Sequence, residues 1–334
     1  MWNGYNPLRQ HGLINFTGMD TFLSCDWGTS NFRLRLVRKD DLLVLATVQN
    51  DQGIAQTAKA WQQQGGTSRK MYYTDFLNRQ ISEMEHQLGK TLSGIPVVMS
   101  GMVSSSIGLV ELPYTKLPFN TDGTGLTPEF IENGHNPLLV ISGACTADDV
   151  MRGEETKIVG AAASMPVTEQ EKLLLLPGTH SKHVWVQGGQ VTGFHTFMTG
   201  EFFALLSGGG ILAGSVAEGG AFSDPANRES FISAVRHSRE IPVLQHCFRV
   251  RTNQLLKGMP AEQNYYYLSG LLIGEELKAI KAGVPVYLMG GALHTQLYAL
   301  ACEALDIRTV LMPDADAALI KGQQIILSGY GRLS

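Results

Sequence analysis

The sequence predicts an α/β protein of two similar halves, each built on a mixed sheet that opens with a three-stranded meander and is flanked by helices. Three observations support this fold class. Strand-like runs and amphipathic helical patterns alternate along the chain. Each half begins with two strand-like runs joined by a Gly-Thr turn. Only 17% of the 334 residues are charged, which indicates a large interior.

Three strand-like runs open the first half, over residues 21–26, 31–38 and 41–49. In the second run, Phe32, Leu34 and Leu36 alternate with residues of the opposite face, which is strand periodicity. A helix is expected next, because apolar residues recur at helical spacing from Leu77 to Leu88. Apolar runs at 96–101 and 137–142 predict further strands, and a second helix is expected at about 153–164.

The strand pattern returns at residue 172, with runs at 173–176, 182–187 and 190–198. A mostly helical region extends to about residue 281. The chain then alternates strand, helix, strand and helix, with the strands at 285–289 and 307–312. We therefore expect a tail of unknown role at residues 1–18, a first domain at 19–168 and a second domain at 169–334.

The two halves align when the numbering is offset by 150 residues. Gly28-Thr29 then falls on Gly178-Thr179, and the apolar positions of the following strands coincide. Only the first copy has a carboxylate before the turn, because Asp26 aligns with Leu176. The sequence therefore indicates an internal duplication in which the two turns face each other.

A Gly-Thr turn presents backbone N–H groups and hydroxyls, and glycine allows a phosphate to approach closely. Two such turns across a cleft could clamp a polyphosphate, with Arg33 and Lys182 adding positive charge. Asp26 could hold Mg²⁺, which takes one or two protein oxygens and completes its shell with phosphate and water. The alternative is two plain hairpin turns with a capping aspartate.

Composition excludes several classes of protein. The formal net charge is −4, so there is no basic field to attract nucleic acid. No apolar run approaches the length that spans a membrane. The four cysteines are widely spaced and form no CxxC, which favours reduced thiols and a cytoplasmic enzyme.

The run CDWGTSNFRLRLV, residues 25–37, resembles the first phosphate loop of the sugar-kinase/Hsp70/actin superfold. More narrowly, the chain resembles the 2-dehydro-3-deoxygalactonokinase family. The matching segments are VVMSGMVSSSIG (97–108), DVMRGEETKIVGA (149–161), LPGTHSKHVWV (176–186), FMTGEFFALL (197–206) and LSGLLIGEEL (268–277). The resemblance implies two ribonuclease-H-like domains around a cleft, and phosphorylation of the 6-hydroxyl of 2-dehydro-3-deoxy-D-galactonate by MgATP in galactonate catabolism.

The resemblance also implies roles for single residues. Asp26 would hold Mg²⁺ directly or through water. ATP would be bound by two phosphate loops and an adenosine motif, comprising Gly28, Thr29, Ser30, Asn31, Arg33, Gly178, Thr179, His180, Lys182, Gly290 and Gly291. Sugar kinases of this fold place an acid at the start of the helix that crosses between the domains. Here glutamate replaces the usual aspartate, and we expect Glu154 to be the base, followed by Glu155 and then Asp149.

The substrate is an anion, so its carboxylate should meet a cation or backbone donors. Arg152 is the candidate, although Arg152 beside Glu154 could equally be a weak surface pair. Met102, Ser104 and Ser105 follow a predicted strand and are candidates for contacting the sugar; the serines equally suit a plain loop. The expected partners are a small sugar acid and ATP, with neither nucleic acid nor membrane, and a homodimer stays open.

Three alternatives remain. One is a kinase of the same fold for another sugar acid or polyol, such as the gluco epimer. Another is a non-catalytic, nucleotide-dependent sugar sensor. The third is a zinc hydrolase that uses His180, His183 and His195, although residues 180 and 183 would point to opposite faces of a strand.

Overall fold

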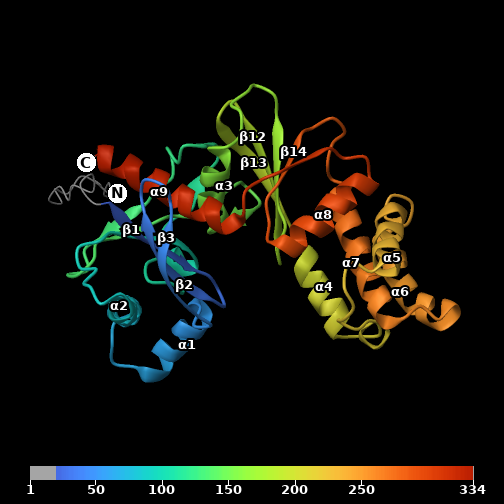
Figure 1. Ribbon diagram of the computed structural model, residues 1–334, viewed down its shortest axis with the longest axis horizontal. Coiled ribbons are helices and arrows are strands. Elements are labelled where there is room, and N and C mark those ends of the chain that lie inside the picture. The colour runs from blue at the N-terminus through green and yellow to red at the C-terminus, as the bar shows by residue number, and fades with distance from the viewer. Residues whose placement is uncertain (1–19, 334) are drawn as a thin grey trace, which may run out of the picture.

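A computed structural model describes residues 20–333, and it contains two lobes, each with a six-stranded sheet (Figure 1). The first sheet has the order β3-β2-β1-β4-β8-β7, formed by β1 (Thr21–Trp27), β2 (Phe32–Arg38), β3 (Val44–Asn50), β4 (Val97–Gly101), β7 (Glu129–Ile131) and β8 (Leu138–Val140). The second has the order β15-β14-β11-β12-β13-β6, formed by β6 (Phe119–Asn120), β11 (Lys172–Leu176), β12 (Ser181–Gln187), β13 (Gln190–Phe197), β14 (Val286–Leu288) and β15 (Thr309–Leu311). A small sheet contains β5 (Thr115–Lys116), β9 (Ala144–Cys145) and β10 (Val150–Met151).

The two large sheets share one plan, which confirms the predicted fold class. In the first, β1, β2 and β3 form an antiparallel meander, and β4 and β8 continue from β1 in parallel. In the second, β11, β12 and β13 form the meander, and β14 and β15 continue from β11 in parallel. Both Gly-Thr turns therefore join the first two strands of a meander, as the 150-residue offset predicts.

Helices cover both sheets. They are α1 (Ile54–Gln64), α2 (Arg69–Leu88), α3 (Glu154–Ala162), α4 (Thr199–Gly208), α5 (Pro225–His237), α6 (Val243–Lys257), α7 (Ala261–Leu277), α8 (Ala292–Ala304) and α9 (Ala315–Leu333), with short 3₁₀ turns at Met102–Ser104 and Ala213–Ser215. The predicted helix through Leu77 is α2, which begins at a Ser68 cap and ends at Gly89 in the left-handed conformation. Its apolar stripe, including Leu77 and Met84, packs under the first sheet.

Helices α3 and α9 lie between the two sheets and share one core with both. They cross in backbone contact at two glycines. A Cβ on Gly160 would lie 1.8 Å from the carbonyl oxygen of Ala318, and a Cβ on Gly322 would lie 1.9 Å from that of Thr156. Only glycine permits this approach. The two glycines therefore allow α3 and α9 to pack closely together between the lobes.

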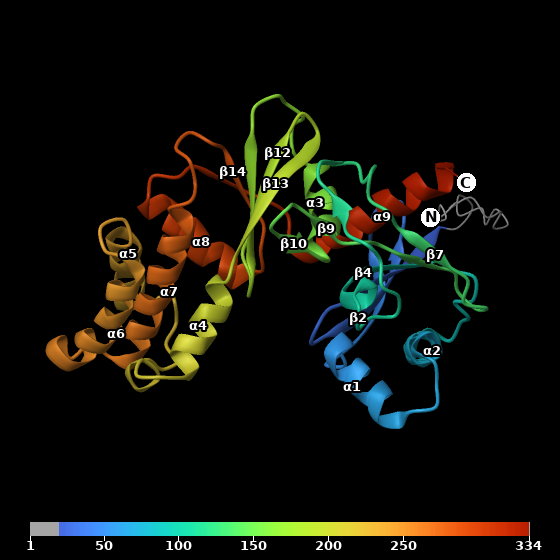
Figure 2. The same ribbon diagram turned by 180° about the vertical axis from the view of Figure 1, so that it is seen from behind.

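Helices α4 to α7 gather on the outer side of the second lobe, around a smaller core of their own (Figure 2). None of the helices formed by residues 20–333 is both long and apolar enough to cross a membrane. The predicted tail, residues 1–18, lies outside the described residues. The domain division at 168/169 stays a prediction. One strand crosses it, because β6 belongs to the first predicted domain by sequence and pairs with β13 in the second sheet.

Candidate active site

A cavity of about 700 Å³ lies between the two Gly-Thr turns and the start of α3. Twelve of the predicted site residues line it: Asp26, Gly28, Thr29, Ser30, Asn31, Arg33, Met102, Arg152, Glu154, Thr179, His180 and Lys182. It therefore brings together one turn from each sheet and the helix that lies between the sheets. The lining also includes Tyr114 and Lys157, which the sequence analysis missed.

The first turn directs its carbonyl groups away from the cavity. These carbonyls accept hydrogen bonds from the start of α1: the N–H groups of Ile54 and Ala55 donate to the carbonyls of Gly28 and Thr29 at 2.9 and 3.1 Å. Gly28 N–H donates back to Asn31 within the turn at 3.0 Å. Among residues 20–333, the N–H groups of Thr29 and Ser30 have no acceptor. These two amides are therefore available to an anion.

The second turn repeats this arrangement with different partners. Gly178 N–H donates to Ser181 Oγ at 3.3 Å, and the carbonyl of Thr179 accepts from Glu201 N–H at 3.1 Å. The amides of Thr179 and His180 have no acceptor in the described part of the chain. Gly178 does not line the cavity, but Thr179, His180 and Lys182, which follow it, do. Both turns thus offer unpaired amides to one space.

Asp26 lies at the end of β1 on the cavity wall, and among the described residues its carboxylate has no hydrogen bond or ion pair. Arg33 is opposite Asp26 in the β1–β2 register, but its guanidinium turns to Asp316, at 2.7 Å. Arg35 binds the same carboxylate at 2.6 Å. One unpaired carboxylate can supply the protein ligand that nucleotide-bound Mg²⁺ requires. The free amides beside it can bind the phosphates.

The three candidate acids occupy different environments, and only Glu154 lines the cavity. Its side chain is 27% exposed, its Oε1 lies 3.5 Å from Lys182 Nζ, and its Oε2 accepts the N–H of Arg152 at 3.1 Å. Lys182 belongs to the second sheet, whereas Glu154 begins α3. The pair therefore joins the two sides of the cavity.

Glu155 is fully buried, and its carboxyl accepts from the N–H of Gly153 at 2.7 Å and the hydroxyl of Thr156 at 3.1 Å. Burial, and secondly the neighbouring charge of Glu154, raise the pKa of Glu155 to about 8. Asp149 instead holds β13, by accepting from Thr196 N–H at 2.6 Å and Thr196 Oγ1 at 2.7 Å. Neither acid faces the cavity.

Arg152 is anchored rather than loose at the surface. Its guanidinium donates to the carbonyl and the hydroxyl of Ser104, at 2.5 and 2.7 Å, and lies 4.2 Å from the ring centroid of Tyr114. Ser104 and Ser105 are buried and stand behind Arg152 and Met102, since Ser105 Oγ donates to the carbonyl of Met102 at 2.7 Å. The serines therefore support the wall and do not line it.

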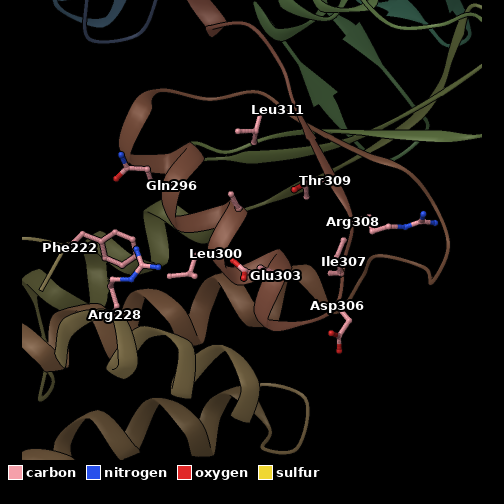
Figure 3. Close-up of a pocket in the computed structure, with 11 residues that line it drawn as sticks. Phe222, Arg228, Gln296, Leu300, Glu303, Asp306, Ile307, Arg308, Thr309 and Leu311 are labelled. Atoms are coloured by element: carbon pink, nitrogen blue, oxygen red, sulfur yellow. The ribbon is translucent and has the colours of Figure 1, made fainter. Parts of the chain in front are cut away.

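Gly290 and Gly291 lie outside this cavity, between β14 and α8. They are nevertheless next to the second turn, because a Cβ on Gly290 would lie 3.5 Å from the ring of Pro177. Another cavity, of about 660 Å³, lies farther along α8 beside β15 (Figure 3). Phe222, Leu300 and Leu311 contribute to its wall, and none of its lining residues belongs to either turn.

The alternative of a histidine metal site finds no matching geometry. His183 Nε2 lies 3.0 Å from Glu276 inside the second lobe, and His180 Nε2 lies 2.5 Å from Glu201 near the surface. The ring of His195 stacks edge-on against Trp185. Within residues 20–333, no group of three or more His, Cys, Asp or Glu side chains is placed to hold a metal ion.

The sequence is similar to those of known proteins. The sequence model of the 2-keto-3-deoxy-galactonokinase family matches residues 26–326. The chain belongs to this family. A Rhizobium meliloti protein called a probable 2-dehydro-3-deoxygalactonokinase is 33% identical, over 90% of this chain and 94% of its own. The 2-dehydro-3-deoxygalactonokinase of Escherichia coli is 31% identical, over 85% of this chain and 90% of its own.

The fold of this family member is also that of a solved relative. A Sinorhizobium meliloti protein to which the same activity is ascribed has a crystal structure that superimposes with a TM-score of 0.76. The match covers 92% of this chain and 96% of the relative, at 31% sequence identity. The protein is thus a kinase of the 2-keto-3-deoxy-galactonokinase family that uses ATP and a sugar acid. It has the two-lobed α/β fold, with one mixed sheet in each lobe, that the sequence predicts.

Proposed function

We propose that the kinase transfers the γ-phosphoryl group of ATP to the 6-hydroxyl of 2-dehydro-3-deoxy-D-galactonate, which yields the 6-phosphate and ADP in galactonate catabolism. The observation that supports this most directly is the cavity with unpaired amides on two facing turns. Phosphoryl transfer depends mainly on positioning and on neutralising the charge of the phosphates. Two amide-bearing turns and Lys182 supply both.

The phosphates of ATP would lie between the turns. The amides of Thr29 and Ser30 would donate to them from one side, and those of Thr179 and His180 from the other. Gly290 and Gly291, next to the second turn, would let the adenosine lie against the backbone. Asp26 would hold Mg²⁺, which, when bound with the nucleotide, neutralises charge on the phosphate oxygens.

Glu154 would act as the base. Its carboxylate faces the cavity and accepts the proton of the sugar hydroxyl as the oxygen of that hydroxyl bonds to the γ-phosphorus; the bond from phosphorus to the β-γ bridging oxygen breaks and ADP leaves. Lys182, 3.5 Å from Glu154, would neutralise charge that develops on the transferred group. Glu155 and Asp149 would support the site through the hydrogen bonds described above.

The sugar acid would bind on the α3 side of the cavity. Arg152, held rigid by Ser104 and Tyr114, would meet its carboxylate, and Met102 would contact its carbon skeleton. Lys157, one turn along α3 from Glu154, is a second cation on this wall. The choice between the galacto and gluco epimers depends on the partners of one hydroxyl.

A cytoplasmic location completes the proposal. All four cysteines are unpaired, which suits a reducing compartment. The non-catalytic sensor is the second candidate, but the cavity retains a candidate base and a candidate metal-binding carboxylate, which a sensor does not need.

The test is ADP release by the purified protein with MgATP and one of four additions: 2-dehydro-3-deoxy-D-galactonate, its gluco epimer, D-galactonate, or no sugar. We expect rapid turnover with the first alone, and a product whose phosphate is on O6. Turnover with the gluco epimer alone would replace the substrate and keep the mechanism. ATP binding without turnover on any of the sugars would favour the sensor.

A further inference from the structure

The second Gly-Thr turn is supported from inside the lobe by a buried carboxylate, Glu276 on α7. The Glu276 side chain is 1% exposed. Its Oε1 lies 3.0 Å from His183 Nε2 on β12, and its Oε2 accepts from the hydroxyl of Tyr298 on α8 at 2.6 Å and from the hydroxyl of Thr199 on α4. A buried carboxylate is tolerated when such donors replace water. Here the donors come from three separate elements.

One chain of hydrogen bonds leads from Glu276 to the turn itself. Tyr298 has a single hydroxyl proton and donates it to the carboxylate, so the hydroxyl of Ser181 must donate to the Tyr298 oxygen, 2.9 Å away. Ser181 Oγ in turn accepts the N–H of Gly178 at 3.3 Å. We call these four residues, Gly178, Ser181, Tyr298 and Glu276, the Glu276 relay.

A second connection runs through the start of α4. Thr199 donates to Glu276, and the next residue, Gly200, lies so close to the turn that a Cβ there would be 2.7 Å from the carbonyl oxygen of Gly178. Glu201 then donates its N–H to the carbonyl of Thr179 at 3.1 Å. With the Gly178 N–H and the Thr179 carbonyl both engaged, the turn can direct only the Thr179 and His180 amides to the cavity.

Stability alone does not account for this arrangement. A buried charge gains little over apolar side chains of the same volume, because its desolvation offsets most of its interactions. Every donor to Glu276 lies on a segment that adjoins the proposed nucleotide site: β12 and α4 contact the second turn, and α8 follows Gly290 and Gly291. The carboxylate therefore links the phosphate turn to the adenosine motif.

We propose that Glu276 is a positioning residue for ATP, which fixes the second turn through Ser181 and Tyr298 before the nucleotide binds. This inference rests on the proposed function of the turn. Its consequence is specific: loss of the relay should weaken binding of the nucleotide and leave the sugar acid and the chemical step almost unchanged, since neither Glu154 nor Arg152 contacts the relay.

The experiment compares Tyr298→Phe with Tyr267→Phe. Each substitution removes one buried hydroxyl from the second lobe. The Tyr267 hydroxyl lies 2.9 Å from His246 Nε2 and also interacts with Arg249 and Asn253, so its partners are on α6 and not on the turn. We expect Tyr298→Phe to raise KM for ATP about tenfold and to leave kcat and KM for the sugar acid within about twofold. Tyr267→Phe should cost similar thermal stability and leave all three constants unchanged.

Two further variants test the connectivity. Ser181→Ala should raise KM for ATP by itself but add little to Tyr298→Phe, because both act on one chain of bonds. Glu276→Gln, which keeps the shape of the carboxylate, should resemble Tyr298→Phe. Unchanged KM for ATP in Tyr298→Phe, or an equal rise in Tyr267→Phe, would overturn the proposal.

Calorimetric titration with a non-hydrolysable ATP analogue separates this inference from the proposed function. If wild-type protein binds the analogue but phosphorylates none of the sugar acids, the proposed function fails while the relay is still tested by the affinities of the variants. Equal affinity of wild type and Tyr298→Phe for the analogue would refute the relay, whatever the sugar. Absence of nucleotide binding by the wild type would refute both.

Discussion

Lys182 Nζ lies 3.5 Å from Glu154 Oε1, and the two side chains come from opposite sides of the cavity. Lys182 is on β12 of the second sheet and is 5% exposed, whereas Glu154 opens α3, which packs between the sheets. A cation and a carboxylate thus meet where the sugar hydroxyl and the γ-phosphate of ATP would meet. In our proposal, the carboxylate receives the proton and the cation neutralises the transferred group.

Replacement of Lys182 by methionine removes that charge and keeps most of the side-chain volume. We expect kcat to fall about 100-fold, as when one electrostatic donor to a transition state is lost. The control is Lys278→Met, because Lys278 is a partly exposed lysine that pairs with Glu275 at 2.5 Å outside the cavity. Steady-state ADP release measures both. Equal activity in the two variants would exclude Lys182 from the chemical step.

Asp26→Ala tests the metal assignment. Asp26 has no hydrogen bond or ion pair among the described residues, so its removal should leave the fold intact, with a melting temperature within about 3 °C of wild type. MgATP-dependent turnover should drop below about 1% of wild type, because the ion loses its protein ligand. Normal turnover in Asp26→Ala, at the same magnesium concentration, would refute the assignment.

Glu155 should make the folded protein sensitive to pH. In the unfolded chain its carboxyl titrates near 4.5, whereas in the folded protein burial raises the pKa to about 8. The folded state therefore holds one more proton between these values, and this contribution to stability is present below pH 4.5 and is lost as pH rises through 8. Within the window the slope is about 1.4 kcal/mol per pH unit at most.

Urea unfolding at several pH values between 5 and 8 measures this slope. The matched variant is Glu155→Gln, which cannot ionise and can still accept from Gly153 N–H. We expect the free energy of unfolding of Glu155→Gln to change less with pH than that of wild type. The stability of the variant relative to wild type should therefore increase as pH rises. Parallel curves for the two proteins would show that Glu155 is ionised in the folded state.

The crossing of α3 and α9 predicts a severe effect from one methyl group. In Gly160→Ala the new Cβ would lie 1.8 Å from the Ala318 carbonyl oxygen, a backbone atom that cannot move without shifting α9. We expect destabilisation of about 3 kcal/mol or more, measured by urea unfolding. Gly329→Ala, on α9 but with open space around its Cβ position, is the control and should be neutral or stabilising by up to about 1 kcal/mol. Similar stabilities would contradict the close crossing.

Much of the fold could be predicted because the signals were local. The alternation in residues 31–38 and the helical spacing from Leu77 to Leu88 reflect burial on one face, and both appear as β2 and α2. The two-residue strands, such as β5 and β10, could not be predicted, because so few residues carry no periodicity. β5 forms by pairing with β9, far along the chain, and β10 forms by pairing with β9 across a short turn.

The candidate site could be predicted in part for the same reason. Both turns and Glu154 lie in short motifs, and the structure brings them to one cavity. Tyr114 was missed because it lies in an irregular segment without a motif and becomes relevant only by stacking on Arg152. Ser104 was assigned to the sugar because its burial behind Arg152 depends on contact between the 3₁₀ turn after β4 and the residues before α3, which spacing does not reveal.

The most direct test of our account compares kcat of Glu154→Gln and Glu155→Gln, with MgATP and the sugar acid at saturation. The two substitutions are chemically identical and adjacent, but only residue 154 faces the cavity. We predict that Glu154→Gln lowers kcat by about 100-fold or more, with little change in either KM, and that Glu155→Gln keeps kcat within about threefold. A large loss of kcat in Glu155→Gln with normal turnover in Glu154→Gln would contradict the central claim.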